Sequence, residues 1–433
     1  MKLYHVLTEN KFTLSAIFSS LHSKNYRLYF IGQGISLIGT WMQNIALSWL
    51  IYRITGSVFL LGLIAFTSQI PMFILSPLTG VLTDRFNKLK IMTLAQGFFL
   101  LQALIMSLLV LFNVVEVWHI IALSIFFGII SAFEAPARQS LVVDLISSPR
   151  DLGNAIALNS ALFNAARLIG PAIAGITIAA VGEGICFLIN AISYFGVIGA
   201  LMSVKLPAKA LKKSESDFKK SFSEGFHYTF GSVPIRTLII MLAALSLFNF
   251  PFIVLLPAYA KEILLGGSDT LGFLMSGLGA GALTGALIMA ARKTIIGLGK
   301  IISANVVILG LTVMLSSFSR QLGLSLFIFY FCGLSMILAL ASANTMIQTL
   351  AEEDKRGRVM SFYAMALMGI MPIGNLLAGS LASSIGIPNT MLLGGAVTII
   401  TAIWFEKNRR SMRQSVRHTY VSKGLISGLP AEQ

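Results

Sequence analysis

Apolar residues occur along this chain in long continuous runs that are separated by short polar segments. Each run is about 20 residues long, which is the length that a helix needs to cross a bilayer. None shows the period-2 alternation of a barrel strand, so we expect helices. The predicted spans cover residues 27–53, 58–83, 91–113, 117–146, 154–180, 183–204, 236–261, 269–291, 298–318, 322–350, 359–383 and 388–406.

One polar stretch in the middle of the chain divides the twelve predicted spans into six and six. We therefore expect an all-α membrane protein built from two six-helix bundles that a cytoplasmic linker joins. The expected segments are a cytoplasmic N-terminal segment (1–26), an N-terminal bundle (27–204), the linker (205–235), a C-terminal bundle (236–406) and a basic cytoplasmic tail (407–433).

Within the linker, phenylalanine recurs at every fourth position from Phe218 to Phe230. This period fits an amphipathic helix that lies along the membrane surface. A solvated tether with scattered aromatic residues is the alternative.

The second half of the chain repeats the first about 204 residues later. Residues 153–182 align with residues 357–386, and four glycines fall on glycines at this offset. Shared hydrophobicity does not explain the aligned glycines, because each marks a close backbone approach or a turn. The repeat predicts two pseudo-symmetric halves, the usual build of a secondary transporter that binds its substrate where the halves meet.

Composition and charge place the chain in the membrane. It is 56% hydrophobic and 11% charged, against roughly 25% charged residues in soluble domains. With the N-terminus in the cytoplasm, 27 of the 32 Lys and Arg residues lie on the cytoplasmic side. This asymmetry follows the positive-inside rule and predicts that both termini are cytoplasmic. The net charge of +15 then reflects topology and contact with anionic lipids, and indicates no nucleic acid.

The loop between the second and third predicted spans, residues 80–90, combines small, acidic and basic residues. Gly80 permits close helix contact, Asp84 suits the positive end of another helix, and Arg85 suits a carboxylate. Lys88 adds to the basic charge. An Asp-Arg pair in a short basic loop that serves topology alone is the alternative.

This loop resembles the signature cytoplasmic loop of the major facilitator superfamily, with Asn87 where that pattern usually has a second glycine. The resemblance covers essentially the whole chain and implies the major facilitator fold. It also implies that Arg85 pairs with Asp144 at the end of the fourth span, and that Asp84 meets the eleventh span near Arg358.

Glycines and prolines at matching places in the fifth and eleventh spans would bend both helices, since proline frees a carbonyl. The residues are Gly170, Pro171, Gly175, Pro372, Gly374 and Gly379. The first three resemble the antiporter motif of the superfamily, and helix packing alone is the alternative role.

Within the superfamily, the chain resembles the branch that holds the enterobactin exporter and the macrolide efflux pumps. Residues 135–139, 154–167 and 357–359 carry this resemblance. It implies a proton-driven exporter of siderophores or drugs in the bacterial inner membrane.

Charges at membrane depth are costly and indicate function. Glu134 and Arg138 lie four residues apart on one helix face, and Arg167 lies in the next span. Glu134 can therefore pair with either arginine. We interpret Glu134 as the proton carrier, with a permanent structural ion pair as the alternative. Two arginines against one glutamate favour an anionic substrate, such as a carboxylate or catecholate chelator.

Amides and aromatic rings in the spans are candidates for the wall of a substrate cavity. The candidates are Gln33, Trp41, Asn44, Asn164, Asn249, Asn344 and Tyr363. Each could instead be a helix-packing residue.

The sequence argues against other classes of protein. It has no His, Cys and carboxylate cluster with metal-ligand spacing and no Gly-rich phosphate loop, so we expect no enzyme, metal or cofactor. A passive channel would need a continuous polar stripe. We therefore expect a monomeric secondary transporter whose partners are a small-molecule substrate, protons and membrane lipids. Import, or flipping of a lysophospholipid, is the alternative to export.

Overall fold

The computed structural model describes residues 18–148, 151–204, 218–292 and 294–423; these residues are almost entirely helical and contain no strand. The elements are η1 (Ser19–His22), α2 (Lys24–Thr55), α3 (Val58–Arg85), α4 (Lys88–Leu111), α5 (Val117–Leu145), α6 (Leu152–Val181), α7 (Glu183–Ser203), α8 (Phe218–Gly231), α9 (Val233–Ala244), η3 (Leu245–Asn249), α10 (Phe252–Ala258), η4 (Tyr259–Ile263), α11 (Ser268–Ala291), α12 (Leu298–Ser316), α13 (Leu322–Leu350), α14 (Arg356–Ala364), η5 (Met365–Gly369), α15 (Met371–Ile385) and α16 (Ile387–Ser422). Three of the short elements, η3, η4 and η5, are π-helical.

In the described part of the chain, eleven helices are long and apolar enough to cross a membrane. The remaining predicted span is the first, 27–53, which corresponds to α2; its adjacent Gln43 and Asn44 lower the hydropathy of the central stretch. Apart from the end of α16, every predicted boundary lies within three residues of a helix end. The last helix is longer than expected, because α16 continues through the first part of the predicted tail to Ser422.

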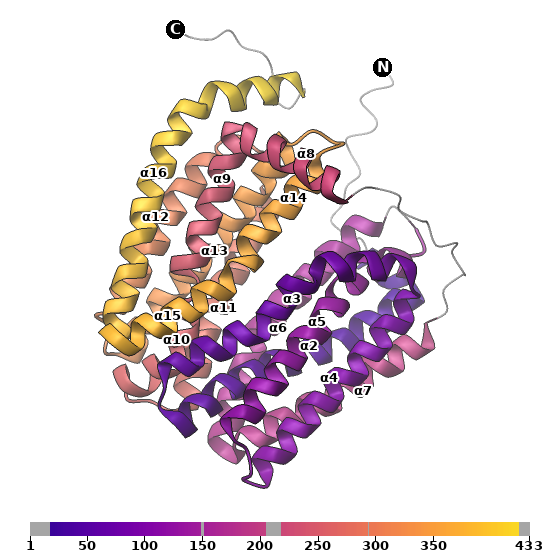
Figure 1. Cartoon of the computed structure of the whole chain (residues 1–433), viewed down its shortest axis with the longest axis vertical. Coiled ribbons are helices and arrows are strands. Elements are labelled where there is room, and N and C mark those ends of the chain that lie inside the picture. Colours follow the sequence, from indigo (N-terminus) through magenta and orange to yellow (C-terminus); the bar gives the residue numbers. More distant parts are fainter. Residues whose placement is uncertain (1–17, 149–150, 205–217, 293, 424–433) are drawn as a thin grey trace.

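The helices form two groups (Figure 1). In the N-terminal group, α2 packs on α6 and α7, α3 packs on α5, and α4 packs on α5 and α7. In the C-terminal group, α13 packs on α11 and α12, and α12 packs on α16. The two groups meet mainly through two helix pairs, α3 with α15 and α6 with α11.

Both helix pairs between the groups cross at glycines. A Cβ atom added to Gly62 of α3 would lie 3.0 Å from the Cα atom of Gly379 in α15 and 2.5 Å from a backbone carbonyl oxygen. One added to Gly175 of α6 would lie 3.0 Å from the Cα atom of Gly272 in α11. Only bare backbone allows so close an approach.

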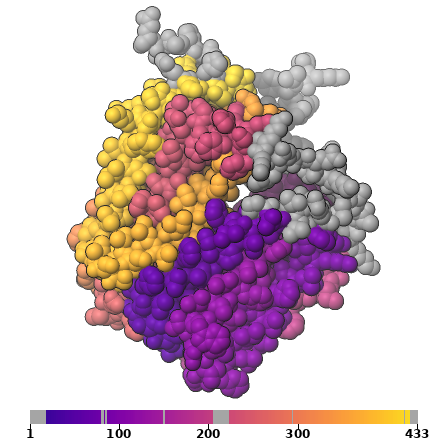
Figure 2. Space-filling view, viewed as in Figure 1, coloured from indigo at the N-terminus to yellow at the C-terminus, as the bar shows by residue number. Residues whose placement is uncertain are grey.

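These crossings lie near one end of the molecule. We call the end that holds α8 the α8 end, and the other the opposite end. Gly62 and Gly272 follow the starts of their helices closely, so both crossings lie toward the opposite end. The groups diverge from there toward the α8 end (Figure 1), and the surface between them is hollowed near that end (Figure 2).

Polar contacts also close the opposite end. The Tyr52 hydroxyl of α2 donates to the carboxylate of Glu262 in η4 and so joins the two groups. Beside it, Lys261 lies over the Tyr52 ring, 5.8 Å from the centroid. Within the N-terminal group, Arg53 pairs with the buried carboxylate of Glu183 at 2.7 Å.

The linker helix α8 contacts α14. Three rings of its aromatic stripe lie 5.4–6.1 Å from the Phe362 ring, centroid to centroid: Phe222, Phe226 and Phe230. Glu224 pairs with Arg358 of α14 at 2.8 Å. The side chain of Phe218 lies outside the described residues. The predicted helix is therefore present and part of its aromatic face packs on protein; its position along a membrane surface stays a prediction.

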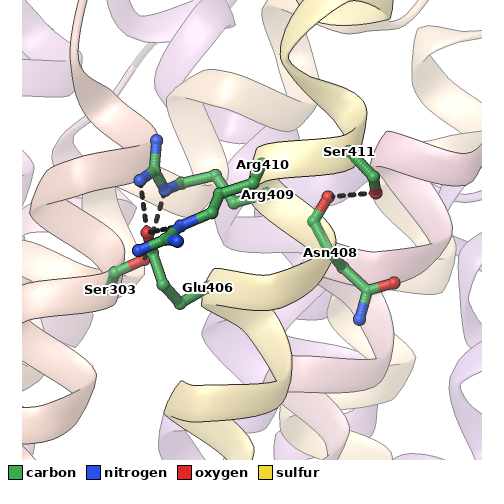
Figure 3. A network of polar contacts seen from close by, with 6 residues as sticks. All are labelled: Ser303, Glu406, Asn408, Arg409, Arg410 and Ser411. Carbon is green, nitrogen blue, oxygen red and sulfur yellow. Dashed lines mark hydrogen bonds and ion pairs between the residues drawn. The ribbon is translucent and has the colours of Figure 1, made fainter.

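A polar network fixes the extended part of α16 (Figure 3). Glu406 accepts hydrogen bonds from Ser303 of α12 at 2.6 Å, from Arg409 at 2.7 Å and from Arg410 at 3.2 Å. At the far end of α16, the amine of Lys423 donates to two backbone carbonyls at the end of α13, at 2.7 and 2.8 Å. These contacts hold residues 407–422 in a helix that sequence alone assigns to a tail.

Candidate functional site

Glu134 and Arg138 of α5 form an ion pair, with 2.9 Å between Oε1 of Glu134 and Nε of Arg138. Glu134 is buried, with 8% of its surface exposed. Of the two pairings that the sequence allows, the structure contains the one within a single helix. Arg138 therefore has its counter-charge on the same helix face.

Two buried polar side chains of α2 belong to the same region, since α2 packs on α5. Tyr29 is fully buried and interacts electrostatically with both Glu134 and Arg138. Its hydroxyl has no hydrogen-bond partner among the described residues, and neither has Oε1 of Gln33, one turn away. The sequence indicated Gln33 as a candidate but not Tyr29. The position of Tyr29, four residues before Gln33 and so on the same helix face, is the pattern that could have indicated it.

Arg167 of α6 lies apart from this ion pair. Its guanidinium carbon is 5.8 Å from the ring centroid of Trp41, and the Trp41 ring meets Phe163 edge-on at 5.7 Å. Gly170 makes room for Trp41, because a Cβ atom there would lie 2.5 Å from the Trp41 Cβ. Asn164, on the same helix, donates to a carbonyl of its own helix.

No carboxylate of the described residues pairs with Arg167, and its buried Nε atom has no hydrogen-bond partner there. A charge at the middle of a bilayer costs about 3 kcal/mol on insertion scales. Cys332 of α13 lies close to the side chain, so Arg167 reaches the junction between the two helix groups.

Of the remaining cavity candidates, Asn249 is buried, whereas Asn344, Tyr363 and Asn44 keep some exposed surface. Asn249 is fully buried and donates to Thr398 at 2.9 Å, so it belongs to the packing of the C-terminal group and is not on an open wall. Asn344 of α13 interacts with Tyr363 of α14 and accepts a hydrogen bond from the next turn of its own helix. Asn44 is exposed on α2.

The signature loop contains an ion pair. Lys88, at the start of α4, donates to Asp144 at 2.9 Å. Asp144 is the carboxylate that the resemblance assigns to Arg85, and that pairing stays a prediction. Asn87 caps α4 by accepting from the backbone N–H of Lys90 at 3.2 Å. Three predicted loop residues lie outside the residues whose side chains are described: Gly80, Asp84 and Arg85.

The aligned glycines make equivalent contacts in both halves. Gly170 packs on α2 and Gly374 packs on η3, which corresponds to α2 in the repeat. Gly175 and Gly379 form the two crossings between the groups. These four glycines therefore take part in close helix packing.

Bending differs between the halves. Helix α6 runs unbroken through Pro171, whereas the π-helical segment η5 ends just before Pro372. The irregular segment therefore occurs only in the second of the two helices, and bending at both places stays a prediction.

The described residues contain no cluster of three His, Cys, Asp or Glu side chains that could hold a metal ion.

A family model described as transmembrane secretion effector matches residues 15–419 of this chain. The staphyloferrin A transporter of Staphylococcus aureus is 26% identical, over 89% of this chain and 96% of that protein. Macrolide efflux protein A of Streptococcus pyogenes is 24% identical, over 88% and 95%. The multidrug efflux pump Tap of Mycolicibacterium fortuitum is 24% identical, over 83% and 88%.

Solved structures share the fold. A bacterial homolog of the human lysosomal transporter Spinster, in an inward-facing conformation, has a TM-score of 0.68 at 12% identity, over 90% of this chain and 98% of that one. A POT family transporter has a TM-score of 0.71 at 14% identity, over 91% and 96%.

Proposed function

This chain belongs to the transmembrane secretion effector family of the major facilitator superfamily, and from that membership we propose that it exports a siderophore or an amphipathic drug-like molecule in exchange for protons. It is a multi-pass membrane transporter of small molecules and not an enzyme. The observation that carries the export proposal is the alignment, over most of the chain, with efflux proteins and a siderophore transporter.

The proposed architecture is twelve transmembrane helices in two pseudo-symmetric six-helix bundles, residues 27–204 and 236–406, with both termini in the cytoplasm. The packing of most helices of α2–α7 on one another, and of most helices of α9–α16 on one another, supports the division into two bundles. The equivalent glycine contacts in the two halves support the symmetry. The surplus of Lys and Arg in the loops at the α8 end supports the orientation.

In this orientation, the space between the groups opens to the cytoplasm at the α8 end, and the glycine crossings and the Tyr52–Glu262 hydrogen bond close the outer side. Substrate then enters from the cytoplasm. Rocking of one bundle against the other reverses the opening, which is the usual form of alternating access.

The proposed coupling residue is Glu134. When it is ionised, its ion pair with Arg138 is complete; when it takes up a proton, Arg138 keeps a charge with no partner on its own helix. Such a change biases the equilibrium between the two conformations, because an uncompensated buried charge is costly. Tyr29 lies close to this pair and its hydroxyl has no partner among the described residues, so it can bind a group that the change exposes.

The test is a transport screen in a bacterial strain that lacks its own siderophore and drug exporters. Siderophores, drugs and lysophospholipids are assayed with and without the protein, and again after the proton gradient is collapsed. The proposal expects gradient-dependent export of a siderophore or a drug. Net uptake, or movement of lysophospholipid alone, would contradict it.

A further inference from the structure

Arg167 lies halfway along α6, about 20 Å along the axis from either helix end. An arginine near a helix end extends its head group to the lipid surface, but this distance exceeds the reach of the side chain. The charge of Arg167 therefore stays in the interior of the molecule.

The surroundings of Arg167 do not supply an anion. Glu134 is bound to Arg138 at 2.9 Å, and no other carboxylate of the described residues pairs with Arg167. The Trp41 ring attracts the guanidinium through its face, which leaves the N–H edge for another partner. The buried Nε atom has none among the described residues.

Arg167 is also at the place where a substrate would contact both helix groups. The next residue, Leu168, accepts a hydrogen bond from Ser276 of α11 through its carbonyl at 3.1 Å. Cys332 of α13 lies close to the guanidinium. Beside it, Phe163 keeps 41% of its surface exposed, although it is a large apolar side chain.

We propose that Arg167 binds a carboxylate group of the substrate and that the rings of Trp41 and Phe163 hold the apolar body next to it. A carboxylate fits because its two oxygens match the planar fork of a guanidinium. The inference rests on the proposed export function and narrows its substrate class to amphipathic carboxylates.

The experiment uses the purified full-length protein in detergent and two probes of nearly the same shape, the anion 2-naphthoate and the neutral amide 2-naphthamide. Binding is measured by calorimetry for the wild type, Arg167→Gln, Arg167→Lys and Trp41→Leu. Arg320→Gln is the matched control, because that arginine lies at the opposite end and donates to backbone carbonyls. Thermal unfolding of each variant is measured in parallel.

We expect the wild type and Arg320→Gln to bind naphthoate at least about tenfold more tightly than naphthamide, the effect of one charge-assisted contact. Arg167→Gln loses this preference, and Arg167→Lys keeps part of it because a point charge remains. Trp41→Leu weakens both probes. Equal binding of the two probes by the wild type, or an unchanged preference in Arg167→Gln, would overturn the proposal.

Transport assays separate this inference from the export function. If export persists but shows no preference for carboxylates and no dependence on Arg167, the site assignment fails while the function stands. If the wild type exports nothing from the panel, the proposed function fails, whatever the binding data show. A purely structural Arg167 would lower the unfolding temperature of both Arg167 variants without changing the ratio of the two affinities.

Discussion

At the residue scale, the membrane interior of this protein holds two arginines in opposite situations. Arg138 is paired with Glu134 on its own helix, whereas Arg167 has an aromatic ring and no carboxylate partner among the described residues. The first arrangement suits a proton-dependent change of charge, and the second suits a ligand that brings its own negative charge. The two arginines differ in role because Arg138 has a carboxylate beside it and Arg167 has none among the described residues.

Glu134→Gln tests the coupling role. The amide keeps the size of the side chain but cannot lose or gain a proton, so we expect proton-driven flux to be abolished while the protein still folds in the membrane. Uptake and efflux in proteoliposomes with and without a pH gradient measure this. Full gradient-driven transport by the variant would remove Glu134 from the coupling role.

The sequence offered the Glu134–Arg138 pair as one of two possible pairings, because a spacing of four residues on one helix brings side chains together. It could not choose between this pair and a Glu134–Arg167 pair. It could not predict that Arg167 meets Trp41, because the two lie on different helices and their contact depends on how α2 packs against α6. Tyr29 was missed for the same reason. A tyrosine in an apolar run is unremarkable until its neighbours across the helix pair are known.

At the scale of elements, the helices and most of their ends were predictable. In a membrane, the backbone N–H and C=O groups of each apolar run must form hydrogen bonds within that run, which favours a helix. Hydropathy does not report where a helix continues beyond the bilayer, so the extension of α16 to Ser422 was missed. The π-helical segments η3, η4 and η5 were missed as well, because they depend on local backbone geometry within an apolar run. The glycines revealed the repeat in the sequence, and in the structure four of them lie at close helix contacts.

Gly62→Ala tests the α3–α15 crossing. The added methyl group would lie 2.5 Å from the carbonyl oxygen of Asn375, so the helices must move apart. We expect a loss of stability of about 1–3 kcal/mol, as for overpacked cores. Thermal unfolding of the purified protein measures it.

Gly97→Ala is the control for this variant, because a Cβ atom at that helical position meets nothing within 4 Å. Its stability should be unchanged or slightly raised, since alanine favours a helix. Equal effects of the two substitutions would show that the α3–α15 contact is not tight.

At the scale of the whole molecule, two groups of helices meet at glycine crossings near one end and diverge toward the other (Figure 1). The repeat predicted that there would be two halves, but not which helices join them. Which helices join the halves depends on contacts between segments far apart in the sequence, such as Gly62 with Gly379. A local sequence pattern does not reveal such contacts. The resulting shape is open toward α8 and closed at the opposite end.

Tyr52→Phe tests the polar contact at the closed end. The variant loses the hydrogen bond to the Glu262 carboxylate, which is worth about 1.5–3 kcal/mol for a charged acceptor. We expect the opposite end to open more often, so that a cysteine placed at the buried Ser268 reacts faster with a membrane-impermeant maleimide. Tyr330→Phe, whose hydroxyl bonds within the C-terminal group, should leave this rate unchanged. Equal rates in Tyr52→Phe and the wild type would show that the contact does not hold the end closed.

The central claim is that the two helix groups move against each other so that one end closes as the other opens. Double electron–electron resonance measures this directly, with one pair of spin labels at exposed Lys90 and Ser361 near the α8 end and another at exposed Phe112 and Phe318 near the opposite end. Native Cys186 and Cys332 are replaced by alanine for labelling. On addition of a transported substrate or a change of pH, the account predicts that the first distance shortens while the second lengthens. Two distances that stay constant, or that change in the same direction, would contradict it.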